Sequence, residues 1–260
     1  MLELGLGALV GVILALTGAG GGILTVPLLV FVVGLDVQQA APIGLMAVGL
    51  AAWTGAILGL KQGIVRYKAA ALMALCGVML APVGFWVAGR LPHDVLAVLF
   101  ALVLVWVAVR AFRQPDDPVP ARPAAPCRLD PQTGRFRWTP RCAATVASSG
   151  IVAGFLSGLL GVGGGFVLVP TLSRFSDLPM RSVAATSLAV IGLVSLSGVC
   201  SAALAGQLSW VVAIPFSGGA VIGMLLGQLL SSSLKGRHLQ RSFGVIAAVA
   251  AVALLMQAAG

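Results

Sequence analysis

The chain has 260 residues, of which 59% are hydrophobic and 9% are charged, and its formal net charge is +9. Soluble domains are about half apolar and about a quarter charged, so this composition excludes a water-soluble enzyme, a disordered chain and a disulfide scaffold. The basic residues occupy short gaps between apolar runs, which membrane orientation explains better than binding to nucleic acid does.

The first part of the chain contains five apolar segments, at about 2–17, 22–34, 42–60, 69–89 and 94–112. A full membrane crossing takes about 20 residues, and the last three segments meet that length. The first two are short, and a glycine cluster separates them. A short broken pair of this kind is typical of a re-entrant hairpin or a discontinuous helix.

A polar stretch rich in Pro and Arg follows at 113–141. Its segment DPVPARPAAP cannot form a regular helix interior, and its segment RLDPQTGRFRW predicts a small surface β-hairpin around a turn. We interpret it as a linker between an N-terminal repeat, 1–112, and a C-terminal repeat, 142–260. The four cysteines form no CxxC motif or Cys/His cluster, so no metal site is predicted.

The second part repeats the first, with apolar segments at about 143–160, 163–175, 185–205, 210–232 and 239–258. GAGGGILTVPLL at 18–29 matches GVGGGFVLVPTL at 161–172 with an offset of 143, and this register holds for most of each half. The sequence therefore predicts an all-α polytopic membrane protein of two five-segment repeats. Each repeat has a glycine-broken short helix pair followed by three transmembrane helices.

Charge placement predicts the orientation. If the three long segments of each half cross the membrane and each broken pair returns to its own side, every basic residue but Arg90 falls on one face. The positive-inside rule makes that face, with the linker, cytoplasmic and puts both termini in the periplasm. Equivalent gaps in the two copies carry opposite charge bias, as at Lys61, Arg66 and Lys68 against the uncharged gap near Gly206. The two repeats are therefore expected to be inverted, a plan common among secondary transporters.

The paired glycine clusters are the main candidate for a binding site. A helix that resumes after a break presents free N–H groups and a partial positive charge, which suits an anion. The alternative is close helix packing, but duplication of the cluster before Pro27 and Pro170 favours a site. We expect substrate contacts at Gly20, Gly21, Gly22, Gly163, Gly164 and Gly165, with Pro27 and Pro170 shaping the breaks.

Hydroxyl side chains within the membrane are further candidates for substrate contacts. Thr186 and Ser187 begin the eighth segment, where they either donate to an anion or cap the helix. Thr54 and Ser197 are equivalent by the offset, and Thr25 follows the first cluster. Membrane hydroxyls more often bond their own helix backbone. No catalytic residue, cofactor or metal ion is predicted.

The seven acidic residues all lie at segment ends or in gaps, which argues against a buried proton relay. An anion leaving a negative cell interior gains about 2.3 kcal/mol per charge per 100 mV. Export therefore needs no other driving force, and the sequence favours export over concentrative uptake.

The two GxGGGxxxxP segments, AATSL at 184–188 and the linker DPQTGRFRWTPR resemble the TauE/SafE family of sulfite exporters and related anion permeases. The resemblance implies a transporter of sulfite, an organosulfonate or a similar small anion in the bacterial inner membrane. A passive anion channel, an uptake permease for thiosulfate or other organic anions, and an intramembrane enzyme using Cys76 or Cys200 remain alternatives. One departure is Pro42-Ile43-Gly44 in the first copy where Thr186-Ser187 stands in the second.

Overall fold

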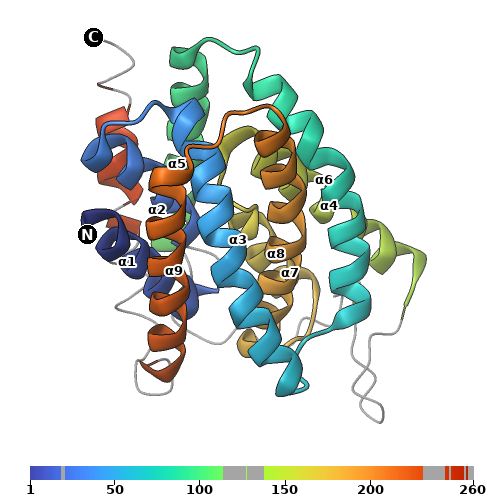
Figure 1. Cartoon of the computed structure of the whole chain (residues 1–260). Coiled ribbons are helices and arrows are strands. Elements are labelled where there is room, and N and C mark those ends of the chain that lie inside the picture. The colour runs from blue at the N-terminus through green and yellow to red at the C-terminus, as the bar shows by residue number, and fades with distance from the viewer. Residues whose placement is uncertain are drawn as a thin grey trace.

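A computed structural model describes residues 1–18, 21–113, 127, 138–230, 244–245, 247–254 and 256. In the first repeat these form α1 (Leu2–Thr17), α2 (Gly21–Leu28), the π-helical turn η1 (Leu29–Val33), α3 (Val37–Lys61), α4 (Tyr67–Ala88) and α5 (His93–Arg113). In the second they form α6 (Pro140–Leu160), α7 (Gly165–Phe175), α8 (Met180–Leu204) and α9 (Trp210–Leu230). Described residues of 244–256 are also helical (Figure 1). The described chain is all-α, as predicted.

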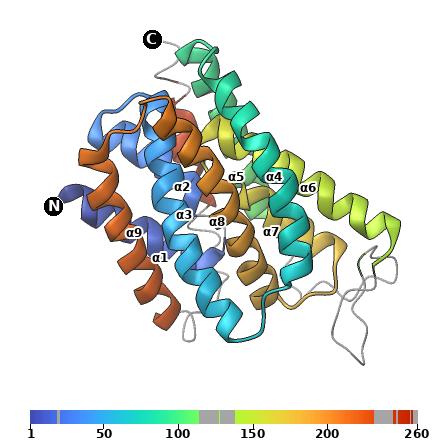
Figure 2. The ribbon, with the colours of Figure 1, turned by 45° about the vertical axis from the view of Figure 1, so that its right-hand side comes forward.

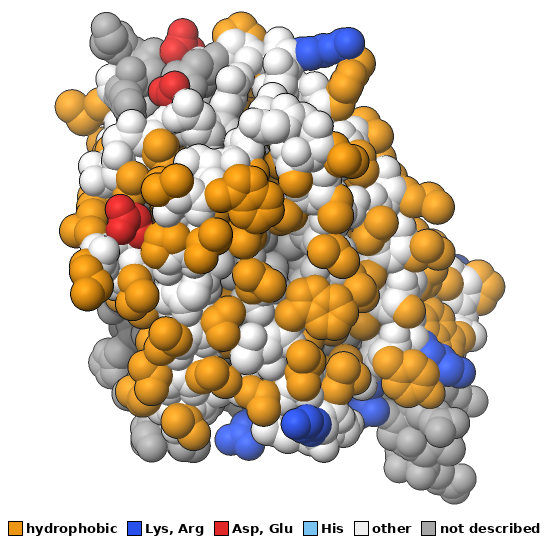
Figure 3. Space-filling model, in the orientation of Figure 1, with side chains coloured by type: hydrophobic (Ala, Val, Ile, Leu, Met, Phe, Trp, Pro, Cys, Tyr) orange, Lys and Arg blue, Asp and Glu red, His pale blue; other side chains and the backbone are white. Residues whose placement is uncertain are grey.

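Five of these helices, α3, α4, α6, α8 and α9, are long and apolar enough to cross a bilayer, with 21 to 25 residues each. Large hydrophobic side chains such as Leu102, Met79 and Ile214 are exposed on the helices. Figure 3 shows such side chains covering the flank of the bundle, while most charged groups gather toward its two ends. An apolar surface of this extent requires lipid around it, so the chain is a polytopic membrane protein.

Helices α3 and α8 form the centre of the bundle, with α1 and α9 on one side and α4 and α6 on the other (Figure 2). Small residues allow the close approach. A methyl group on Gly55 of α3 would touch Leu188 of α8, and one on Gly198 of α8 would touch Leu45 of α3. The offset of 143 relates Gly55 to Gly198 and Leu45 to Leu188, so these contacts are the same contact made twice.

The central pair also gives the relative direction of the two copies. Gly49 of α3 packs on Ser195 of α8, and Gly59, further along α3, packs on Ala185, earlier in α8. Equivalent helices therefore run antiparallel, which supports the inverted arrangement that the charge pattern predicts.

Each broken helix pair folds back on itself. Gly21, the first residue of α2, packs on Val10 and Leu14 of α1, and its equivalent Gly164 packs on Ala153 of α6. Gly18 and Gly161 end the preceding helices in the left-handed conformation, with φ of 72° at both, as helix C-caps commonly do. This geometry supports a helix pair broken at the glycines in each repeat, of which α6 alone is long enough to cross a bilayer.

Some predicted boundaries are wrong. The sixth segment was expected to be short, but α6 has 21 residues. It begins at Pro140 because Thr139 caps it, accepting a hydrogen bond from the Cys142 amide at 3.1 Å, and Pro suits the first helical turn. Helices α3 and α8 begin at Val37 and Met180, about one turn before the predicted starts. The predicted β-hairpin lies outside the described residues.

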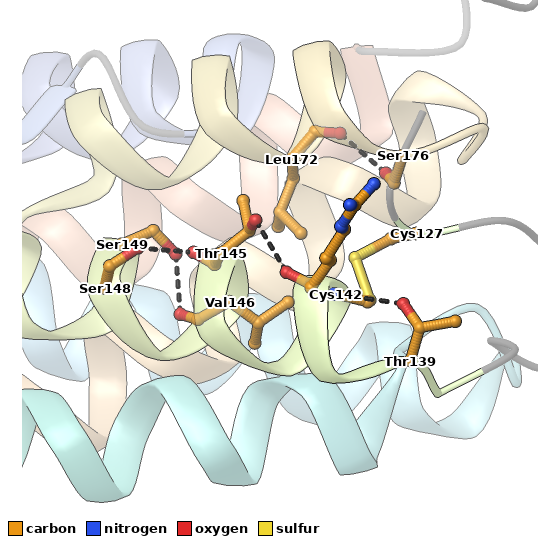
Figure 4. The surroundings of a disulfide bond; sticks show 10 residues. Cys127, Thr139, Cys142, Thr145, Val146, Ser148, Ser149, Leu172 and Ser176 are labelled. Atoms are coloured by element: carbon orange, nitrogen blue, oxygen red, sulfur yellow. Dashed lines mark hydrogen bonds between the residues drawn. A yellow bond between two sulfur atoms is a disulfide. The ribbon is translucent and has the colours of Figure 1, made fainter. Parts of the chain in front are cut away.

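One described residue of the linker is anchored twice. Cys127 forms a disulfide with Cys142 at the start of α6 (Figure 4). Its amide also donates a hydrogen bond to the carbonyl of Phe175 at the end of α7, at 3.1 Å. A single parallel β-bridge joins Cys127 to Ser176. The linker is therefore fastened to both helices of the second broken pair, a pairing that the sequence analysis did not predict.

Candidate functional site

The two glycine breaks meet at the centre of the bundle. A methyl group on Gly22 would overlap the carbonyl oxygen of Val162, which lies in the second break. Val48 of α3 touches both breaks, because added methyl groups on Gly22 and Gly163 would lie 3.4 and 3.1 Å from its Cγ1 atom. Ile191, the equivalent of Val48 in α8, also contacts Gly163. The two breaks are therefore in direct contact, and the apolar side chains of Val48 and Ile191 pack beside them.

The second break exposes backbone donors to the protein interior. Gly163 and Gly164 have φ of 76° and 67°, a conformation that side-chain-bearing residues rarely adopt. Both residues are buried, and within the described part of the chain no backbone carbonyl accepts their amide hydrogens. Helix α7 begins at Gly165, so its positive dipole end faces the same place. Buried N–H groups without acceptors cost free energy, and an anion would satisfy them.

A hydroxyl that sequence reasoning missed completes this arrangement. Ser195 of α8 is fully buried, its Oγ atom has no partner among the described residues, and that atom would lie 3.5 Å from a methyl group on Gly163. Its equivalent in the first repeat is Ala52, so the repeat itself gave no signal. A single Ser among Leu and Val residues of an apolar segment looks like helix packing. Only the fold brings it beside the break.

Most of the predicted hydroxyls have other partners. Thr25 donates to Gly21 at 3.1 Å, Thr54 to Leu50 at 2.9 Å, and Ser197 to Val78 of α4 at 3.1 Å, in each case to a carbonyl oxygen. Their single donor protons are therefore already used. Ser187 is buried and, like Ser195, has no partner among the described residues.

Thr186 does not cap α8, which begins six residues earlier. Its Oγ1 atom instead accepts a hydrogen bond from the backbone amide of Arg66 at 3.1 Å. Ser182, one turn before it, donates to the carbonyl of Ile64. These two bonds fasten the loop between α3 and α4 to α8, at the end of the bundle that carries the linker.

The remaining predicted residues differ in role. Methyl groups on Gly21 and Gly164 would overlap backbone oxygens of α1 and α6. The lack of a side chain at these two glycines therefore serves close helix packing. Pro27 and Pro170 lie inside α2 and α7 and not at the breaks, which corrects their predicted role. The π-helical turn η1 begins two residues after Pro27, whose ring removes a helix hydrogen bond. Gly20 lies outside the described residues.

A cavity of about 570 Å³ lies at the end of the bundle opposite the linker. The amides of Gln38, Gln39 and Gln207 line it, and it reaches Ala41 and Gly158. Ala41 packs directly on Gly161 at the start of the second break. The cavity therefore connects that end of the bundle to the neighbourhood of the buried donors, and none of its lining residues is charged.

Comparison with known proteins places this architecture in a family. The model of the family described as "Sulfite exporter TauE/SafE" matches residues 3–254. The chain belongs to the TauE/SafE family. A "Probable membrane transporter protein" of Xylella fastidiosa (strain Temecula1) is 32% identical to this chain in sequence. The match covers 97% of this chain and 93% of the relative.

More distant relatives occur in other organisms. "Probable membrane transporter protein YunE" of Bacillus subtilis is 25% identical over 88% of both chains. "Probable membrane transporter protein MJ0441" of Methanocaldococcus jannaschii is 24% identical over 96% of this chain and 93% of its own. No solved structure matches the chain. As a TauE/SafE protein, the chain is a membrane transporter and not an enzyme.

Proposed function

We propose that this TauE/SafE protein exports a small sulfur-containing anion, sulfite or an organosulfonate, by alternating access. The observation that carries the proposal is the group of buried donors without acceptors at the second break: the amides of Gly163 and Gly164 and the hydroxyl of Ser195. Donors fixed in a buried site suit the oxygens of a sulfur oxoanion. They bind it without a buried positive charge.

The lack of a buried acid supports export. The buried polar side chains of the described residues are all Ser or Thr. Concentrative uptake of an anion against the membrane potential requires a coupling ion, for which transporters usually bury Asp, Glu or His. Outward movement of the anion follows the potential without such a group.

The conformation supports the outward-facing half of a transport cycle. The cavity lined by Gln38, Gln39 and Gln207 leads toward the second break from the end opposite the linker. At the linker end, the Ser182 and Thr186 bonds close the α3–α4 loop over α8. Among the described residues, the basic ones apart from Arg90 lie in helix ends and loops at the linker end, whereas Asp36 and Asp94 lie at the starts of α3 and α5 at the other end. We therefore assign the linker end to the cytoplasm and the cavity to the periplasmic side.

The test is flux from proteoliposomes loaded with sulfite, thiosulfate, an organosulfonate or a carboxylate, with the membrane potential set by a potassium gradient. We expect saturable efflux of a sulfur oxoanion that speeds up when the interior is negative. Non-saturating flux would indicate a passive channel. Accumulation that requires a proton or sodium gradient would indicate an uptake permease.

A further inference from the structure

A second cavity lies on the lipid-facing side of the bundle, between α5, α6 and α7, with a volume of about 460 Å³. Its wall is apolar over most of its length and includes Leu99, Leu102 and Trp106 of α5, Val152 of α6 and Phe166 of α7. Leu102, Trp106 and Val152 are 57%, 46% and 47% exposed. The groove is therefore open to the surroundings of the bundle, which in a membrane protein are acyl chains.

Two arginines lie at one end of this groove. Arg110, near the end of α5, and Arg174, near the end of α7, both line it. The Arg110 guanidinium lies 5.5 Å from the ring centre of Trp106, and that of Arg174 lies 5.8 Å from the ring centre of Phe175. Among the described residues, neither arginine forms an ion pair.

The two guanidinium groups are close enough to repel one another, and Arg110 is partly desolvated. Two like charges at the edge of an apolar groove repel one another, and an anion between them would relieve this repulsion. The other described charges near this end, such as Asp177, make no contact with either guanidinium. An anion that pairs with both arginines would therefore come from outside the described residues.

We propose that this groove binds one anionic phospholipid. The phosphate would lie between Arg110 and Arg174, and an acyl chain would lie along Trp106, Leu102 and Leu99. The stretch of α5 from Leu99 to Arg110 is about 16 Å long, close to half the hydrocarbon thickness of a bilayer, about 15 Å. Basic pockets between transmembrane helices on the cytoplasmic side bind such head groups. The apolar wall distinguishes a lipid from a free phosphate, which could use only the two arginines.

The position of the groove gives the lipid a structural role. Helix α7 is the returning half of the second broken pair, and Phe166 follows the break by one residue after Gly165. A lipid lying between α5 and α7 would contact α7 along the groove. Binding would therefore stabilise the folded protein in proportion to lipid occupancy.

The test measures the melting temperature of the full chain, delipidated in a neutral detergent, as lipid is added. Phosphatidylglycerol is expected to raise it, whereas phosphatidylcholine with the same acyl chains and glycerol 3-phosphate without them are not. Arg110→Gln and Arg174→Gln should each raise the half-maximal concentration of phosphatidylglycerol about fivefold. Arg90→Gln is the matched control, because Arg90 also stacks on a tryptophan, Trp86, at 3.5 Å, but at the opposite end of the bundle.

Val152→Trp separates the acyl-chain part of the site from the phosphate part. Because Val152 is exposed in the groove, a larger side chain there fills the groove without burying new surface inside the bundle. It should abolish the phosphatidylglycerol response while leaving the melting temperature without lipid unchanged. Equal responses to both lipids, a full response to glycerol 3-phosphate, or an unchanged response in both arginine variants would overturn the proposal.

Discussion

The hydroxyl of Ser195 in α8 lies beside the backbone of Gly163 in the second glycine break, with 3.5 Å between its Oγ atom and the position of a methyl group on Gly163. Both groups are buried, and neither the hydroxyl nor the Gly163 amide has a partner among the described residues. A side-chain donor from one central helix and a backbone donor from the break thus converge. The proposed anion site therefore depends on the Ser195 hydroxyl as well as on the glycine backbone.

Replacing Ser195 with Ala should weaken anion binding about tenfold or more, because a hydrogen bond to a charged group contributes about 1.5–3 kcal/mol. The melting temperature should not fall, since the lost hydroxyl makes no bond within the protein. The half-saturating substrate concentration for flux in proteoliposomes measures the effect. Ser217→Ala is the control, because Ser217 is also buried and without a partner but lies in α9. Equal substrate affinity in both variants would remove Ser195 from the site.

Gly163→Ala should reduce flux by at least about tenfold, since displacing a donor amide costs a hydrogen bond to the anion. The added methyl group would press on Val48 and Ile191, at 3.1 and 2.9 Å. Gly63→Ala is a matched control, because Gly63 has φ of 68° in open space. Both substitutions place a side chain in the left-handed conformation, costing about 1–2 kcal/mol. If the control lost as much flux as Gly163→Ala, backbone strain and not the site would explain the loss.

The sequence was sufficient to predict an all-α polytopic membrane protein, and its internal repeat indicated which residues of the two halves are equivalent. Equivalent contacts such as Gly55 with Leu188 and Gly198 with Leu45 follow from it. The site was less accessible to sequence reasoning, because the glycine pattern does not distinguish a residue that packs a hairpin, such as Gly21, from one that exposes an amide, such as Gly163. The Cys127–Cys142 disulfide was missed for a related reason. The sequence does not show that the chain near Cys127 returns to the start of α6.

Val48→Ala should admit bulkier anions. Val48 packs against Gly22 of the first break and Gly163 of the second, and removal of two carbons from it widens the space beside both. The core should lose about 1–3 kcal/mol of stability, while the flux of an organosulfonate should rise relative to that of sulfite. Ala47→Gly is a neighbouring control that shortens a buried α3 residue outside these contacts. An unchanged ratio of the two fluxes would show that Val48 does not limit substrate size.

Thr186→Val should release the α3–α4 loop from α8. The substitution keeps the side-chain shape but leaves the Arg66 amide without its acceptor, at a cost of about 1–3 kcal/mol. Thermal unfolding measures this cost, and proteolysis at the nearby Lys61 should become faster. Thr145→Val is the control, because Thr145 is exposed and donates to its own helix at Arg141. Equal stability in the two variants would show that the loop is held by other contacts.

The Cys127–Cys142 bond tests the orientation of the whole protein. The pair lies at the linker end, where the basic residues place the cytoplasm, and the cytoplasm keeps thiols reduced. In cells quenched with acid and alkylated under denaturing conditions, we therefore expect all four cysteines to react.

After purification in air the disulfide should form, leaving Cys76 and Cys200 reactive. Closure of a 15-residue loop should add about 3 kcal/mol of stability. Cys142→Ser, which cannot form the bond, gives the reference for both measurements. A bonded pair in freshly quenched cells would place the linker end in an oxidising compartment, which would reverse the proposed orientation and put the cavity on the cytoplasmic side.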